Sequence, residues 1–202
     1  MTLETRNFAI SEVRAKDAAT GRASGYAAVF NSDSADLGSF VERIAPGAFS
    51  RSLSATTAGT ISIYALWAHD KSQPLGATRS GKLNLAEDHR GLAFDLDTTR
   101  FTAAQLDALA DGDLQMSFGF IVREQDWRED RAGKVTRTIK DLDLTEISFV
   151  IDPAYPDTTA ALRSLDAWKA EAIEVPTNTT YKIDVSPMTK RALDAVLRAK
   201  GL

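Results

Sequence analysis

The chain has 202 residues, of which 44% are hydrophobic and 26% are charged, and its formal net charge is −4. These proportions are usual for a soluble globular protein and supply enough apolar material for a core. The absence of cysteine excludes disulfides, zinc–thiolate sites and thiol nucleophiles. Because both signs of charge are interspersed, the chain also lacks the basic footprint of a nucleic-acid binder.

No stretch approaches the roughly 18 consecutive apolar residues that indicate a membrane span. Residues 1–14 lack the apolar run of a signal peptide. We therefore expect a protein that stays soluble where it is made and has no contact with a membrane.

Short apolar runs bounded by turn residues predict β-strands over the first two thirds of the chain. The expected strands cover residues 25–30, 40–44, 61–67, 75–85, 91–96, 114–122, 136–142 and 144–150. Pro46 opens a short helix, since a first helical turn does not use that residue's amide hydrogen. Residues 54–60 are small and polar and predict a loop, and the charged segment 127–134 predicts a hairpin tip.

Helical patterns follow at residues 102–110, with Thr102 as a cap, and at residues 158–172. A linker is expected over 174–187 and a last helix over 188–200. The pattern as a whole predicts a mixed α/β, mainly β fold: a small closed or partly open β-barrel surrounded by short helices. We expect a main domain at 1–165 and a C-terminal helix, linker and tail helix at 166–202.

His69 is one of two histidines and directly follows the apolar run at 61–67. A histidine at the end of a strand can be held by the sheet and still reach a cleft, where its imidazole accepts a proton near neutral pH. The spacing alone favours a structural histidine, so both interpretations stay open at this point.

Ser117 lies between Met116 and Phe118, and Gly119 follows. In an extended segment Met116 and Phe118 face the core while Ser117 faces the opposite side, and a glycine allows a ligand backbone to approach closely. The alternative is an ordinary serine on the solvent side of a strand, which this pattern alone favours.

Glu146 belongs to an alternating segment in which Ile147 and Phe149 share one face, so Glu146 and Ser148 share the other. A carboxylate in that place can accept the far ring proton of a histidine and fix its tautomer. A solvated acid on an exposed face is the alternative.

Two aspartates, Asp70 and Asp88, rival Glu146 as partners of His69, although strand alternation turns Asp70 away from its neighbour. The second histidine, His89, stands in a charged turn and is expected to be exposed. The chain has no HExxH spacing and no glycine-rich phosphate loop, so we expect no metal and no organic cofactor.

Seven segments taken in order resemble the prohead (capsid maturation) serine proteases of tailed bacteriophages, over about residues 8–160. They are residues 25–30, 42–49, 66–76, 88–92, 116–120, 144–150 and 153–156. That family is similar to the herpesvirus assembly proteases, which carry a serine and a histidine on a small β-barrel with surrounding helices. The resemblance implies the same type of fold here.

The resemblance also implies Ser117 as nucleophile and His69 as general base. Herpesvirus enzymes use a second histidine late in the chain, but this chain has none after His89. At the comparable place it offers Glu146, to which we assign the orienting role. The implied enzyme is a serine endopeptidase without a cofactor.

By the same resemblance, the substrates are the scaffold segment or an N-terminal extension of the major capsid protein. They are cut inside assembling proheads in the host cytoplasm. The protease domain is then 1–165, and self-cleavage in the linker at 174–187 would remove the tail, because proteases accept exposed backbone. A homo-oligomer is compatible with the sequence.

Two interpretations from other classes remain open. One is a non-catalytic capsid assembly or scaffolding protein on the same fold, in which the helix at 188–200 docks on a capsid partner. The other is a β-barrel binding module without enzymatic activity.

Overall fold

The computed structural model describes residues 2–7, 13–16, 21–34, 36–151 and 159–173. The chain divides into two compact units, Met1–Trp168 and Lys169–Leu202. The expected linker at 174–187 and tail helix at 188–200 lie outside the described residues.

The described residues form ten strands and three helices, so the fold is mainly β as the sequence predicts. In chain order these are β1 (Glu4–Asn7), β2 (Val13–Lys16), β3 (Arg22–Val29), β4 (Phe40–Ile44), α1 (Ser50–Thr57), β5 (Tyr64–Trp67), β6 (Asp70–Ala77), β7 (Leu83–Glu87), β8 (Gly91–Asp97), α2 (Ala103–Asp111), β9 (Gln115–Glu129), β10 (Val135–Val150) and α3 (Thr159–Ile173).

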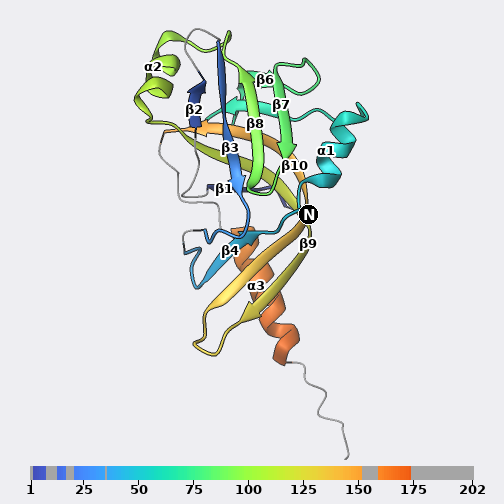
Figure 1. Ribbon diagram of the computed structural model, residues 1–202. Helices are drawn as coiled ribbons and strands as arrows, with labels where there is room; N and C mark the ends of the chain where they lie inside the picture. The colour runs from blue at the N-terminus through green and yellow to red at the C-terminus, as the bar shows by residue number, and fades with distance from the viewer. Residues whose placement is uncertain (1, 8–12, 17–20, 35, 152–158, 174–202) are drawn as a thin grey trace, which may run out of the picture. The chain divides into compact units, whose positions relative to one another are not determined.

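The strands form two sheets (Figure 1). The larger sheet has the order β1-β9-β10-β5-β6, with β4 also paired to β10, and it curls into a half-barrel. The smaller sheet has the order β2-β3-β8-β7. The expected small barrel is therefore present as a curled half-barrel sheet with a second sheet against it.

The long antiparallel hairpin of β9 and β10 forms the centre of the larger sheet. On its other edge β10 pairs in parallel with β4 near one end and with β5 near the other. The sequence predicts two strands, 136–142 and 144–150, where the structure has the single strand β10. Register shifts at Ile139/Asp141, Asp141/Leu142 and Leu144/Glu146 let this strand bend while its pairing continues.

Two other expectations about elements are wrong. The expected strand at 75–85 is divided into β6 and β7 by a turn in which Gly81 has φ 69°. Residues 54–57, expected in a loop, belong to α1. Serine and threonine are weak helix formers, but the buried Ser52 hydroxyl donates to the Leu142 carbonyl oxygen and accepts from the Leu144 amide, which fixes α1 on β10.

Aromatic side chains join the two sheets in one core. Phe149 of β10 packs edge-on against Phe94 of β8, with ring centroids 5.7 Å apart, and against Phe101, 5.5 Å away. Phe118 of β9 packs in the same way against Phe49 at 5.6 Å. Alternation therefore points one face of the β9–β10 hairpin into this core, and Ser117, Glu146 and Ser148 lie on the other face.

A buried cluster of four charged side chains fixes β1, β4 and β10 on the core face. Arg137 Nη1 donates to Glu4 Oε2 and to Glu42 Oε2, both at 2.8 Å, and Arg6 Nε lies 3.1 Å from Glu42 Oε1. Arg6 also donates to Glu4. Burial alone would lower the pKa of Arg137, but its hydrogen bonds and the carboxylate charges raise it. Two acids and two arginines make the cluster neutral.

We predict that Glu42→Gln lowers the free energy of unfolding by about 3–5 kcal/mol, because it leaves a buried arginine charge without compensation. Urea unfolding followed by tryptophan fluorescence measures the change. Asp126→Asn is the matched control, since Asp126 pairs with Lys140 at the surface, where both side chains are about 40% exposed. Equal destabilisation by the two variants would contradict the prediction.

Candidate active site

His69 occupies a two-residue hairpin turn. Strands β5 and β6 pair up to Trp67 and Asp70, which leaves Ala68 and His69 as the connection. Their φ values are 50° and 62°, as the tightest hairpin turns require, although glycine and asparagine adopt this region at lower cost. The Ala68 amide donates to the Phe149 carbonyl oxygen at 2.9 Å, which holds the turn against β10. The sequence placed His69 at a strand end; the structure places it in this strained turn.

Glu146 forms a hydrogen bond with His69, as the sequence hypothesis required of an orienting residue. His69 Nδ1 lies 2.7 Å from Glu146 Oε1, and the Ser148 hydroxyl donates to Glu146 Oε2 at 2.5 Å. The Glu146 side chain is 9% exposed and that of His69 is 31% exposed. A carboxylate accepting from Nδ1–H leaves Nε2 of a neutral imidazole free to accept a proton.

Gly119 leaves the space that Glu146 fills. The two residues are opposite each other in the β9–β10 register. A Cβ atom on Gly119 would lie 2.6 Å from Glu146 Oε1 and 2.9 Å from Thr145 Oγ1. The sequence indicated close approach of a ligand at this glycine; the residue that approaches is Glu146.

Ser117 lies on the same face as Glu146, in the neighbouring strand. It is opposite Ser148 in the register of β9 and β10, so Glu146 is its diagonal neighbour, at a typical distance of about 7–8 Å between backbones. Ser117 as a residue is 1% exposed, and its hydroxyl donates to the Arg6 carbonyl oxygen of β1 at 3.1 Å. Among the described contacts His69 bonds to Glu146 and Ser117 bonds to β1, so no direct hydrogen bond joins serine and histidine.

The rival acids have other partners. The Asp70 carboxylate accepts from Ser72 and Gln73, and these hydrogen bonds lower its pKa. The Asp88 carboxylate accepts from the Tyr26 hydroxyl and two backbone amides, which lowers its pKa. His89 is exposed in the turn between β7 and β8, as predicted.

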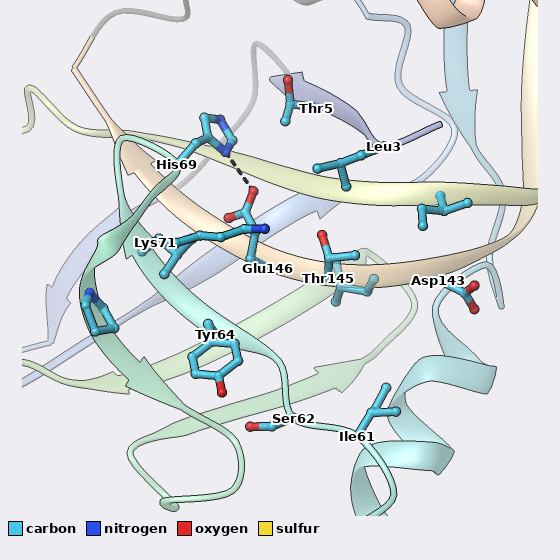
Figure 2. Close-up of a pocket in the computed structure, with 14 residues that line it drawn as sticks. Leu3, Thr5, Ile61, Ser62, Tyr64, His69, Lys71, Asp143, Thr145 and Glu146 are labelled. Carbon is cyan, nitrogen blue, oxygen red and sulfur yellow. Dashed lines mark hydrogen bonds and ion pairs between the residues drawn. The ribbon is translucent and has the colours of Figure 1, made fainter. Parts of the chain in front are cut away.

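A cavity of about 910 Å³ opens beside His69 and Glu146 (Figure 2). Its walls are mostly apolar, with the side chains of Leu3, Ile61, Tyr64, Leu66, Pro74, Ile121 and Leu144. Three of them, Leu3, Ile61 and Tyr64, are 48%, 37% and 47% exposed. The cavity therefore offers apolar surface directly beside the histidine–glutamate pair.

Asp143 also lines this cavity, but its charge is compensated. Arg51 and Arg123 both form ion pairs with it. These contacts lower the pKa of Asp143, although burial alone would raise it. The acid therefore does not make the cavity a cation site, and in the described part of the chain no cluster of histidine and acidic residues has the form of a metal site.

The profile of a protein family described as Caudovirus prohead serine protease matches residues 10–171. No curated protein and no solved structure matched the chain. No helix among the described residues is long and apolar enough to cross a membrane.

We predict that Gly119→Ala breaks the His69–Glu146 hydrogen bond, since the new methyl group would overlap the Glu146 carboxylate. Long-range ¹H–¹⁵N spectra of the imidazole rings show which nitrogen of His69 carries the proton. The chain has two histidines, so the signals to be assigned are few. In the unaltered protein at pH 8 we expect the His69 proton on Nδ1, and in the variant a mixture of tautomers.

The matched control is Gly76→Ala, where a Cβ atom would lie 2.7 Å from the end of the Leu96 side chain. This variant should leave the His69 signals unchanged. If Gly119→Ala also leaves them unchanged, Gly119 does not determine the position of Glu146.

Proposed function

Because the chain belongs to the Caudovirus prohead serine protease family, we propose that it is a serine endopeptidase with Ser117 as nucleophile, His69 as general base and Glu146 as the residue that orients His69. The family consists of serine proteases of phage proheads, and membership supports a role in capsid maturation, within assembling proheads and on capsid proteins. What we propose beyond family membership is the catalytic role of each of these three residues and the identity of the individual substrates.

The observation that carries the assignment is the hydrogen bond between His69 Nδ1 and Glu146 Oε1. A buried carboxylate on Nδ1 holds the imidazole in the tautomer that a general base needs and stabilises the imidazolium that forms during the reaction. Ser148 secures the second carboxylate oxygen, so Glu146 is held from two sides.

The proposed chemistry is acyl transfer. Neutral His69 takes the Ser117 proton through Nε2 while the hydroxyl oxygen attacks a peptide carbonyl carbon. The imidazolium then protonates the leaving amine, and water repeats the two steps on the acyl-enzyme. The shared face of Ser117 and Glu146 on adjacent strands supports this assignment, because it brings the hydroxyl to the side of the sheet on which His69 lies.

The proposed substrates are the scaffold segment or an N-terminal extension of the major capsid protein, and the enzyme itself. The proposed protease domain is residues 1–165, and self-cleavage in the linker at 174–187 would remove the part of the C-terminal segment that follows the cut. We further propose a herpesvirus-assembly-protease-like arrangement, in which glutamate replaces the second histidine. Homo-oligomerisation is part of the same proposal.

One observation favours the alternative, a non-catalytic capsid assembly or scaffolding protein on this fold. Ser117 is 1% exposed, and its hydroxyl is bonded to a backbone carbonyl of the same chain. A serine that stays in this state cannot reach a substrate.

We predict that Ser117→Ala abolishes trimming of the major capsid protein of the same phage when the two are co-expressed, with a loss of at least about 10³-fold in rate. Intact-mass analysis of the capsid protein measures it. The same analysis of the purified protease should show a C-terminal fragment lost from the unaltered chain and retained in the variant.

The matched control is Ser148→Ala, which removes the neighbouring hydroxyl in the same row of the sheet. It should slow trimming only about tenfold, because it removes one hydrogen bond to Glu146. Normal trimming by Ser117→Ala would refute the enzyme assignment and leave the assembly protein as the function.

A further inference from the structure

Strand β1 lies against the proposed nucleophile in the way that a bound peptide would. It is the last strand on its side of the larger sheet, and it pairs antiparallel with β9 so that Asn7 is opposite Ser117. The Arg6 carbonyl oxygen accepts a hydrogen bond from Ser117 Oγ at 3.1 Å. A carbonyl of β1 is thus in contact with the hydroxyl that has to attack a carbonyl in the substrate.

Side chains of this segment also enter the cavity beside His69. Leu3 and Thr5 both line it, and Figure 2 shows them facing the same hollow as His69 and Glu146. Because alternate residues of a strand share a face, an extended peptide in this place presents every second side chain to the cavity. Leu3 is the apolar member of that series, and its neighbours there are apolar.

We propose that a substrate segment binds as an extended strand paired antiparallel with β9, in the place that β1 takes in this structure, with a large aliphatic side chain in the cavity where Leu3 lies. This proposal rests on the proposed function. Strand addition gives main-chain hydrogen bonds at the edge of β9, and the cavity selects the alternate side chains. Strand β1 must move away before Ser117 can react.

The buried charged cluster permits this movement. Glu4 and Arg6 belong to β1 and pair with each other, whereas Glu42 and Arg137 belong to β4 and β10 and pair with each other at 2.8 Å. When β1 leaves, the contacts of Arg137 with Glu4 and of Arg6 with Glu42 break, and the cluster separates into two neutral pairs. Since no charge is left buried without a partner, the largest cost of opening a buried ion cluster is avoided.

The first test is a disulfide that ties β1 to β9. Continuing the register of Glu4 and Phe120 by two residues places Thr2 opposite Val122, and both line a small cavity that contains Glu4 and Arg137, away from His69. The chain has no cysteine, so Thr2→Cys with Val122→Cys forms a unique crosslink. We expect the oxidised protein to cleave a mixture of unfolded peptides at least tenfold more slowly than the reduced protein.

The single variant Thr2→Cys should be insensitive to oxidation. Equal rates for the oxidised and reduced double variant would overturn the proposal while leaving the enzyme assignment intact. If the reduced double variant and the unaltered protein are as inactive as Ser117→Ala, the proposed function itself fails. Hydrogen exchange of the unaltered protein then tests whether β1 leaves β9. We expect the amides of β1 to exchange far faster than those in the centre of β10, and equal protection would refute the movement.

The second test is the sequence of the cut peptides. Leu3 is the fourth residue counted back from the Arg6–Asn7 bond, the bond whose carbonyl contacts Ser117. We expect an at least fivefold enrichment of leucine, isoleucine, valine, methionine or phenylalanine at the corresponding position of the cut peptides. Ile61→Asp, on the cavity wall, should remove this preference. Unaltered cleavage without any apolar preference there would refute the assignment of the cavity.

Discussion

The antiparallel pairing of β9 with β10 is the constraint on which the rest of the site depends. It sets Ser117 opposite Ser148 and Gly119 opposite Glu146. The Ser117 hydroxyl, the Glu146 carboxylate and the space that Gly119 leaves for this carboxylate are therefore on one face of the sheet. The other face of the same hairpin is held in the core by Phe118 and Phe149. A shift of the pairing by one residue would reverse both faces, because the side-chain period of a strand is two. Core packing and site geometry are therefore specified by the same register.

A second constraint is the way in which the chain buries charge. Four charged side chains, two of β1 and two of the neighbouring strands β4 and β10, have almost no exposure to water, and each acid is paired with an arginine. Hydrophobic residues of similar volume could fill this space without the desolvation cost of ions. The ionic cluster differs from such packing in one respect. In the proposed movement, β1 keeps the pair of Arg6 and Glu4, and the rest of the sheet keeps the pair of Arg137 and Glu42.

Sequence patterns predicted the elements that have strong alternation or a clear cap. Strand β4 was predicted with its observed bounds, and α2 follows its predicted cap Thr102, which accepts from the Gln105 amide. Helix α1 was missed at residues 54–57 because its stability comes from the contacts of Ser52 with β10, which composition does not reveal. The turn at Gly81 was missed although residues 78–82 are polar, because the apolar residues on either side were joined into one expected strand.

In the candidate site, too, local patterns predicted some features, while others depend on contacts between distant segments. Strand alternation left Glu146 as either a partner of His69 or a solvated acid, the resemblance assigned it the orienting role, and the structure brings the two side chains together. Gly119 faces the Glu146 carboxylate because of a register shift between Leu144 and Glu146. Ser117 is buried because β1 is the strand that pairs with this edge of β9. Both are long-range pairings, so no local pattern in the chain contains them. The left-handed conformation of Ala68 and His69 was missed for a related reason, since neither residue type indicates it.

The turn at Ala68 and His69 has a consequence for how the proposed enzyme is kept inactive. With β5 and β6 paired directly on either side, the backbone of His69 keeps its place beside β10 unless this hairpin comes apart, and the hydrogen bond to Glu146 orients the imidazole. In the proposed mechanism the proton acceptor is thus already in place in this structure, before any contact with a capsid protein. By the same proposal, a timing signal would act on Ser117, by setting when β1 uncovers its hydroxyl.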